Sequence, residues 1–392
     1  MENNSQILLQ AGENREDYFM AVTPPIIQSS NFCFNTVEDM RKGILNEYEA
    51  PFYTRGYNPT VAILRKKLAL LESCEDALVC SSGSAAVAVA LTGFLSAGDH
   101  VICVQKPYSW TYRMLNQLLA KFGVETSFVD GKDISNFKKA IRQNTRVVFL
   151  ESPNSMTFEM QDIEAVAALC KENGLISMID NSYNSPLFQK PHTLGIDLVI
   201  HSSTKYINGH SDVVSGVVCG STEHIRKLYA NEWMTLGTAI SPNDAWLMIR
   251  GLRTLELRAD RSAGTARKVY EAIANHPAIE QILYPFANDN PQRDLAMKQM
   301  SQCAGMFSVV IKGRTFKAAE TFSNALQNFL MAASWGGYES LAFPVCAFSK
   351  TSWFSESALP HNLIRLYFGL EDPQMLISDV LNALNLAQTE ID

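Results

Sequence analysis

The stretch Leu198-Val-Ile-His-Ser-Ser-Thr-Lys-Tyr206 decides how the fold of this chain is interpreted. Its first four residues, Leu198 to His201, have the apolar character of a buried strand, and three hydroxyl residues and a lysine follow directly. In α/β folds, ligands bind beyond the carboxyl ends of the strands. Lys205 is therefore expected beside an apolar core, where such a fold holds its ligand.

A lysine in that position has a specific chemistry. Near an apolar core it loses the hydration that favours the ammonium form, so its pKa falls and its amine can form an imine with an aldehyde. The stretch alone is equally compatible with Lys205 extending outward to solvent. Other segments of the sequence have to decide between these interpretations.

Short apolar runs alternate with amphipathic segments on both sides of this stretch, between about residues 60 and 240. This alternation is typical of parallel strands joined by crossover helices. The expected strands are residues 77–80, 100–104, 125–129, 147–150, 176–179, 198–201 and 216–219, and the expected helices are 61–71, 84–94, 112–122, 134–142 and 161–172. The sequence thus predicts an α/β domain with a mostly parallel sheet of about seven strands and helices on both faces.

A smaller α+β domain is predicted after Ser241-Pro242. One long helical stretch is expected from there to about Ala274, where Pro277 ends it. The remaining predicted elements are strands at 306–311 and 363–368 and helices at 316–326 and 375–388.

The N-terminal segment contains Pro24-Pro25 and has little periodicity. It is predicted to be an extended arm that packs on a neighbouring subunit. The expected division is an arm at 1–55, an α/β domain at 56–245 and a C-terminal domain at 246–392.

Composition argues against several classes of function. The 33 basic and 40 acidic residues give a net charge of -7, with no Lys/Arg block that could follow a nucleic-acid backbone. The eight cysteines form no C-x-x-C pair and are expected to be buried thiols in a reducing cytoplasm, without disulfides or a metal site. The polar N-terminus gives no secretory signal, and no apolar segment is long enough to cross a membrane. We expect a cytoplasmic enzyme with no nucleic-acid or membrane partner.

The run Ile176-Ser-Met-Ile-Asp180 ends a second apolar strand in a carboxylate. A buried aspartate needs a cationic partner, and a protonated pyridine nitrogen is one. Keeping that nitrogen protonated is what makes a pyridine ring an electron sink. The alternative is that Asp180 only caps the turn that follows.

The run Cys80-Ser-Ser-Gly83-Ser84 joins a predicted strand to a predicted helix. Free backbone N–H groups, hydroxyls and the positive helix end suit a single phosphate. Neither G-x-G-x-x-G nor G-x-x-x-x-G-K-[ST] occurs, so dinucleotide and nucleoside triphosphate binding lack support. Turns of this composition also occur for structural reasons alone.

The order of motifs along nearly the whole chain resembles the pyridoxal-phosphate (PLP)-dependent cystathionine synthase and lyase family of cysteine and methionine metabolism. The matching motifs are Tyr53-Thr-Arg55-Gly-Tyr-Asn58-Pro59-Thr60, Ser82-Gly83, Tyr108, Glu151-Ser-Pro153, Asp180-Asn181 and Ser202-Ser-Thr204-Lys205-Tyr206. The resemblance implies a fold-type-I, aspartate-aminotransferase-like architecture and PLP as the cofactor.

The resemblance also implies roles for individual residues. Lys205 would hold PLP as a Schiff base, Asp180 would pair with the pyridine nitrogen, and Tyr108 would stack on the ring. The expected phosphate ligands are Gly83, Ser84, Ser202 and Thr204, with Tyr53 and Arg55 of the adjacent subunit. A site completed by a neighbour implies an obligate dimer, which in this family is usually paired into a homotetramer.

Two C-terminal motifs, Ser334-Trp335-Gly-Gly-Tyr-Glu339 and Leu363-Ile-Arg365-Leu366, also resemble the family. By that resemblance Arg365 binds the α-carboxylate of an amino-acid substrate, for which a planar bidentate guanidinium is well suited. The alternative for an arginine on a strand is a surface ion pair.

Three departures from the family pattern bear on the reaction. Ser155 stands where an asparagine near the ring oxygen is usual, Trp335 replaces a leucine, and Ala333 stands where γ-type enzymes often have a glutamate. Ser155 and Trp335 resemble the bacterial cystathionine β-lyases. We therefore expect a carbon–sulfur lyase that cleaves cystathionine or a related cysteine conjugate by β-elimination, with Ser155, Ser334 and Trp335 near the substrate.

Other features point to a γ-type member, the main alternative: a methionine or cystathionine γ-lyase or a cystathionine γ-synthase. The motif from Tyr53 to Thr60 has the γ-type form, although Trp110 stands where γ-enzymes usually have a small residue and could narrow the substrate pocket. Trp110 and Trp335 could equally be core residues.

Two readings from other classes have little support. Ser202-Ser-Thr-Lys205 fits the S-x-x-K pattern of serine acyl-enzymes, but neither S-D-N nor K-T-G accompanies it. A non-catalytic regulator with a PLP fold is the other alternative, but such a protein would not need a matching residue at every cofactor-binding position, as this chain has.

Overall fold

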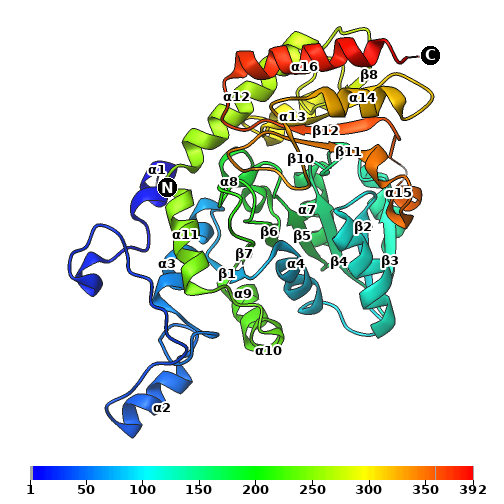
Figure 1. The fold of residues 1–392 in the computed structure, drawn as a ribbon. Helices are drawn as coiled ribbons and strands as arrows, with labels where there is room; N and C mark the ends of the chain where they lie inside the picture. The colour runs from blue at the N-terminus through cyan, green and yellow to red at the C-terminus, as the bar shows by residue number, and fades with distance from the viewer. Residues whose placement is uncertain (1–2, 358, 392) are drawn as a thin grey trace.

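The computed structural model describes residues 3–357 and 359–391, and two sheets organise it (Figure 1). The large sheet has the strand order β1-β7-β6-β5-β4-β2-β3. Its strands are β1 (Asp76–Cys80), β2 (His100–Val104), β3 (Glu125–Val129), β4 (Thr145–Glu151), β5 (Ile176–Asp180), β6 (Leu198–His201) and β7 (Gly216–Gly220). The seven predicted strands are thereby confirmed.

Within the run β6-β5-β4-β2-β3 every neighbouring pair of strands is parallel, and β7 is antiparallel to both β1 and β6. The central strands β4 and β6 are almost entirely buried. Buried parallel strands have continuous apolar runs because both faces are covered by helices. This explains why their positions could be predicted closely.

The helices of the first 240 residues are α1 (Asn4–Gln10), α2 (Val37–Leu45), α3 (Pro59–Leu71), α4 (Gly83–Thr92), α5 (Ser109–Arg113), α6 (Ile134–Ala140), α7 (Ile163–Glu172), α8 (Ser185–Phe188), α9 (Thr222–Leu228) and α10 (Met234–Leu236). Helix α4 packs against β6 and β7, and α3 packs against β1. The prediction of one continuous helix at 112–122 is wrong, because this segment is divided into three short helical pieces. It consists of α5, a π turn (Met114–Leu118) and a 3-10 turn (Leu119–Phe122) that ends at the left-handed Gly123.

The small sheet has the order β10-β11-β12-β9-β8, and α12, α14 and α16 lie on its outer face, whereas α11 packs on α3 (Figure 1). The elements are β8 (Ile279–Leu283), β9 (Met306–Ile311), β10 (Leu330–Met331), β11 (Leu341–Pro344), β12 (Leu363–Tyr367), α11 (Pro242–Leu252), α12 (Leu255–Ile273), α13 (Arg293–Gln299), α14 (Lys317–Ala325), α15 (Ser352–Ser357) and α16 (Pro373–Gln388). A mixed α/β fold with a smaller C-terminal sheet was predicted and is confirmed.

The long helix expected from 242 to 274 is interrupted between α11 and α12. The Gly251 carbonyl, which a continuous helix would use, accepts hydrogen bonds from Arg258 Nη2 at 2.8 Å and from the Thr254 hydroxyl at 3.3 Å. These side chains take the place of the intrahelical bond, and the helix axis breaks there.

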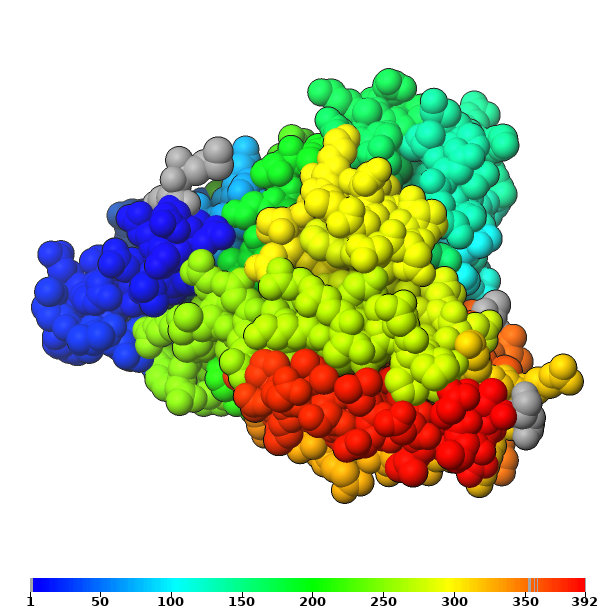
Figure 2. All heavy atoms as spheres, turned by 90° about the horizontal axis from the view of Figure 1, so that it is seen from above, coloured from blue at the N-terminus to red at the C-terminus, as the bar shows by residue number. Residues whose placement is uncertain are grey.

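Helices α1 and α2 within the first 55 residues were not predicted. Ile7 and Leu8 of α1 are buried, and α1 packs on α3 of the same chain. Beyond α1 the chain extends away from the body, with α2 at its far end (Figure 1). Phe19 in this segment is completely exposed. Seen from above, the N-terminal residues project on the side away from the C-terminal end of α16 (Figure 2).

All eight cysteines lie in the described residues. Seven are buried, as predicted, whereas Cys33 in the projecting segment is exposed, so that prediction is wrong for Cys33. None of the helices in the described residues combines the length and apolar character needed to span a lipid bilayer.

Candidate active site

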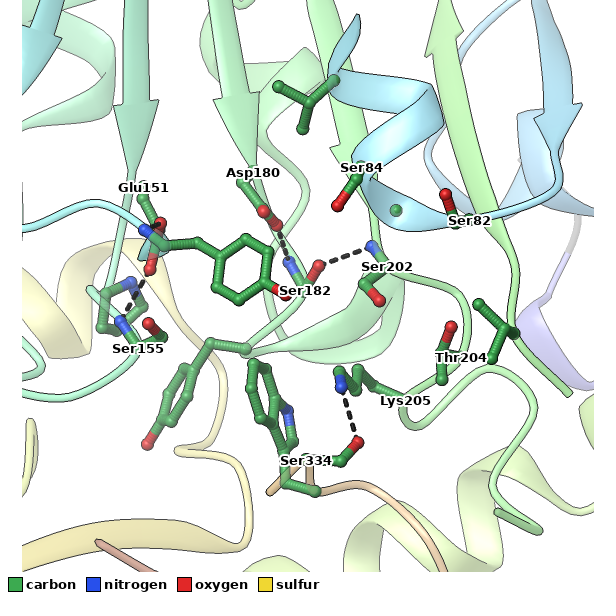
Figure 3. A pocket seen from close by; sticks show the side chains of 17 residues that line it. Ser82, Ser84, Glu151, Ser155, Asp180, Ser182, Ser202, Thr204, Lys205 and Ser334 are labelled. Carbon is green, nitrogen blue, oxygen red and sulfur yellow. Dashed lines mark hydrogen bonds between the residues drawn. The ribbon is translucent and has the colours of Figure 1, made fainter. Parts of the chain in front are cut away.

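A cavity of about 310 Å³ opens at the carboxyl ends of β4, β5 and β6, against a loop of the small sheet. The labelled side chains converge on this space, Ser84 and Asp180 from one side and Ser334 from the opposite side (Figure 3). Ten sequence-predicted residues line it: Gly83, Ser84, Tyr108, Ser155, Asp180, Ser202, Thr204, Lys205, Ser334 and Trp335.

Lys205 follows β6 and lies inside this cavity instead of extending to solvent. Its Nζ donates a hydrogen bond to Ser334 Oγ at 2.6 Å and lies 4.5 Å from the centre of the Trp335 ring. Burial lowers the pKa of Lys205 to about 8, the Arg365 charge adds to this effect, and Asp180 opposes it. About a tenth of the amine is thus neutral and nucleophilic at pH 7, a far larger fraction than for an exposed lysine.

Asp180 ends β5 and combines both roles that the sequence left open. Its Oδ1 accepts the Ser182 N–H at 2.9 Å, as a turn cap does, and its side chain lines the cavity. Ser182 Oγ in turn accepts the Ser202 N–H at 2.6 Å, which ties the ends of β5 and β6 together. Burial raises the pKa of Asp180, so a cation placed beside it would stabilise its charged form.

The Ser82–Ser84 turn brings the start of α4 close to the end of β6. Ser82 caps the helix by accepting the Ala85 N–H at 3.0 Å. A Cβ atom on Gly83 would lie 2.8 Å from the Ser202 Cβ, so the close approach requires glycine. The first N–H groups of α4 and the hydroxyls of Ser84 and Ser202 form an anion-binding corner of the cavity.

Thr204 was predicted to bind a phosphate, but its hydroxyl is already hydrogen-bonded to the main chain. Its hydroxyl donates to the Ser215 carbonyl at 3.0 Å and accepts the Ser215 N–H at 2.9 Å. The hydroxyl hydrogen is therefore engaged with the main chain. Thr204 would have to turn this hydrogen away from Ser215 to donate it to a phosphate.

Arg365 on β12 lies behind the cavity wall and is almost completely buried, which excludes the surface ion pair considered above. Its guanidinium donates to the Ser155 carbonyl at 3.0 Å and to the Ser334 carbonyl at 3.3 Å. It also lies 4.9 Å from the centre of the Trp335 ring. Burial lowers the pKa of Arg365 to about 10, so it stays a cation at neutral pH.

The loop between β10 and β11 supplies the small-sheet side of the cavity. Ser334 and Gly336 both have left-handed backbones, with φ of 85° and 86°. A Cβ atom on Gly336 would lie 2.5 Å from the Tyr206 nitrogen, so glycine allows this loop to reach the lysine segment.

A family model described as Cys/Met metabolism PLP-dependent enzyme matches residues 5–385. The chain belongs to this family. It is thus an enzyme of cysteine and methionine metabolism whose cofactor is PLP, and the family and cofactor predictions are confirmed.

Named relatives and a solved structure agree over nearly the full length. The chain is 35% identical to an L-methionine gamma-lyase of Treponema denticola over 384 residues, which cover 96% of this chain and 95% of the relative. It is 36% identical to a cystathionine gamma-lyase of Sus scrofa, with 97% and 93% covered. The crystal structure of metB from Corynebacterium glutamicum superposes with a TM-score of 0.92 at 34% identity, covering 98% of both chains.

The donor set of this family member fits PLP. Asp180 can hold a protonated pyridine nitrogen, and the corner formed by Gly83, Ser84 and Ser202 can hold a phosphate. The amine of Lys205, with its lowered pKa, can react with the aldehyde.

The remaining predicted residues lie elsewhere. Within the described part of the chain, Tyr53, Arg55 and Trp110 do not line the cavity. Tyr53 is 42% exposed on the N-terminal segment, and the Arg55 guanidinium lies 5.5 Å from its ring centre. Trp110 is 54% exposed, so it is not the core residue considered as an alternative. Trp335 is nearly buried but faces Lys205 in the cavity.

Sequence reasoning missed some residues that line the cavity, namely Ser82, Val87, Glu151, Pro153, Ser182, Tyr183 and Val214. Glu151 and Pro153 stood in a matching motif but received no role. Ser182 follows Asp180 by two residues, and because an aspartate side chain commonly accepts the backbone N–H two residues further on, Ser182 could have been recognised as a partner of the turn that Asp180 caps.

Proposed function

We propose that this chain is a carbon–sulfur lyase that cleaves the γ-carbon–sulfur bond of methionine or cystathionine. The observation that carries the proposal is the similarity, over nearly all of both chains, to relatives named L-methionine gamma-lyase and cystathionine gamma-lyase. The same relatives give less support to β-elimination of cystathionine, which Ser155 and Trp335 favoured. Those two residues are then variations within a γ-type pocket.

The cavity supplies groups that suit this chemistry. PLP, when bound, provides the electron sink for the carbanion formed at the substrate α-carbon. Lys205, with a pKa near 8, is the proposed base that removes the α-proton. Ser334 holds its Nζ at the small-sheet side of the cavity.

A γ-elimination also requires a proton to leave the β-carbon and another to reach the departing thiolate. Lys205 and Tyr108 are the proposed carriers, since both line the cavity. Burial raises the pKa of the Tyr108 phenol, and the nearby charges of Asp180 and Glu151 add to the shift. Tyr108 is therefore protonated at neutral pH and able to donate.

The substrate carboxylate is proposed to bind Arg365, the buried cation at the rear of the cavity. Ser155, Ser334 and Trp335 would surround the substrate beside it. Trp110 does not line the cavity of its own chain, so we propose that it narrows the substrate entrance of a neighbouring subunit.

We further propose a homotetramer with active sites shared between pairs of subunits. Tyr53 and Arg55 are exposed on the N-terminal segment, and we propose that they complete a neighbour's phosphate site. Exposed apolar residues on that segment support this contact, namely Phe19, Met20, Val22, Val37 and Leu45. We keep the division into an arm at 1–55, a PLP domain at 56–245 and a C-terminal domain at 246–392, and a cytoplasmic location.

Product analysis tests the reaction. Purified protein with PLP is incubated separately with cystathionine and with methionine, and the keto acids and thiols are identified. The proposal expects 2-oxobutyrate with ammonia, together with cysteine from cystathionine or methanethiol from methionine. If cystathionine gives pyruvate and homocysteine and methionine is not turned over, the enzyme catalyses β-elimination and the proposal is wrong. Lys205→Ala is the inactive control.

A further inference from the structure

Glu151 is a buried carboxylate of the cavity wall to which the proposed chemistry gives no part. It is the last residue of β4, and only 4% of its surface is exposed. Its two oxygens accept hydrogen bonds from two different loops, Oε2 from the Tyr108 N–H at 2.5 Å and Oε1 from the Ser155 N–H at 2.7 Å. The second of these bonds is drawn in Figure 3.

Both loops carry residues of the cavity. Tyr108 lies between β2 and α5, and Ser155 lies in the loop that follows β4. The Tyr108 side chain makes no capping hydrogen bond to α5, and the Tyr108 backbone N–H donates to Glu151.

The connection continues to the small sheet. The Ser155 carbonyl accepts from Arg365, whose guanidinium also reaches the Ser334 carbonyl. Glu151 thus links the backbone of Tyr108 to the backbone that Arg365 holds. A shift at Glu151 would move the tyrosine and the carboxylate-binding arginine relative to each other.

The surroundings of Glu151 are unusual for a structural acid. Burial raises its pKa to about 8, the Asp180 charge adds to this, and the two N–H bonds oppose it. A buried acidic side chain without a functional role lowers the free energy of unfolding, and an apolar residue at the same position would avoid this loss.

We propose that Glu151 is a positioning residue that fixes the Tyr108 ring against the cofactor face and holds Ser155 in place for Arg365. The inference rests on the proposed use of this cavity for PLP and of Tyr108 as the stacking residue. It adds that the orientation of the bound ring depends on an acid that does not touch the reacting atoms.

The test compares Glu151→Gln with Asp379→Asn in PLP-loaded protein. Asp379 on α16 is a matched control, because it is also buried and also accepts backbone N–H bonds, from Gln327 at 3.0 Å and Asn328 at 2.8 Å, but it does not line the cavity. The measurements are the visible circular dichroism per bound PLP, which reports ring orientation, the PLP dissociation constant and the free energy of unfolding.

Glu151→Gln is expected to lose at least about half of the visible dichroism and to weaken PLP binding roughly 10-fold, since an amide can accept only one of the two N–H bonds and turns its NH₂ group toward the other. Asp379→Asn is expected to lower stability and leave both cofactor signals unchanged. If Glu151→Gln does not fold, Glu151→Asp replaces it, because aspartate keeps the carboxyl group but is too short to span both N–H groups.

The proposal is overturned if the Glu151 variant keeps its dichroism and its PLP affinity within twofold of the parent protein. It is also overturned if both variants lose these signals in proportion to lost stability, which would show a purely structural role. Failure of the unmodified protein to bind PLP would instead remove the premise on which the site itself was assigned.

Discussion

Lys205 Nζ donates a hydrogen bond to Ser334 Oγ over 2.6 Å, and this bond joins the loop after β6 to the loop between β10 and β11. The amine of the large sheet is therefore positioned by a residue of the small sheet. Ser334 holds this place with a left-handed backbone, a conformation that non-glycine residues rarely adopt. The geometry of the reactive amine thus depends on how the two sheets pack.

The lowered pKa of Lys205 predicts how PLP recombines with cofactor-free protein. Only the neutral amine attacks the aldehyde, and a pKa of about 8 makes the neutral fraction rise roughly tenfold between pH 7 and pH 9. The initial rate of recombination, followed by visible absorbance, should rise with pH and level off above pH 8. A rate that keeps rising past pH 10 would mean that Lys205 has the pKa of an exposed lysine. Lys205→Ala should give no stable visible band.

Gly336 is predicted to be intolerant of a side chain. Gly336→Ala combines a φ of +86° with a Cβ only 2.5 Å from the Tyr206 nitrogen, whereas Gly237→Ala has a φ of +66° and no atom within 4 Å. The control should lose about 1–2 kcal/mol of unfolding free energy through backbone strain alone. Gly336→Ala should lose roughly 1–3 kcal/mol more through steric overlap. Urea denaturation at fixed protein and saturating PLP measures both, and equal losses would exclude the overlap.

Much of the large sheet could be predicted because its central strands are buried on both faces. Residues 100–104 and 198–201, which are buried along their whole length, were bounded correctly from their apolar runs. The two chemical groups at strand ends, Asp180 and Lys205, followed from the rule that ligands bind there.

The features that were missed depend on contacts between distant segments. Glu151 binds backbone N–H groups, which leave no pattern in the sequence. The break after α11 arises because the guanidinium of Arg258, seven residues further on, donates a hydrogen bond to the Gly251 carbonyl. Tyr53 and Arg55 are exposed in one chain, and their proposed place in a neighbour's site needs that neighbour.

The pair between Lys67 and Glu13 is predicted to hold α1 against the large domain. Both side chains are completely buried, with Lys67 Nζ 3.1 Å from Glu13 Oε1. Glu13→Gln leaves an ammonium group without its counter-charge and should cost roughly 3–5 kcal/mol of unfolding free energy. Glu38→Gln, which breaks the exposed pair with Arg41, should cost less than about 1 kcal/mol. Similar small losses in both variants would show that the buried pair contributes little.

Arg365→Lys is predicted to separate substrate binding from turnover. A lysine cannot donate a bidentate pair to a substrate carboxylate and also reach the Ser155 and Ser334 carbonyls. KM for an amino-acid substrate should rise roughly 30-fold or more, which corresponds to the loss of about 2 kcal/mol from a buried charge pair, while kcat changes less. Steady-state kinetics with cystathionine and methionine measure this split.

Arg258→Lys is the matched control for Arg365. Arg258 is also buried and also donates to two main-chain carbonyls, those of Tyr206 at 2.9 Å and Gly251 at 2.8 Å. Neither of these residues lines the cavity, whereas the two residues that accept from Arg365, Ser155 and Ser334, do. Its replacement should lower the free energy of unfolding and leave KM within a few-fold of the parent value. If both variants raise KM equally, then Arg365 acts through the packing of β12 and not through the carboxylate, and the substrate must be held by another cation.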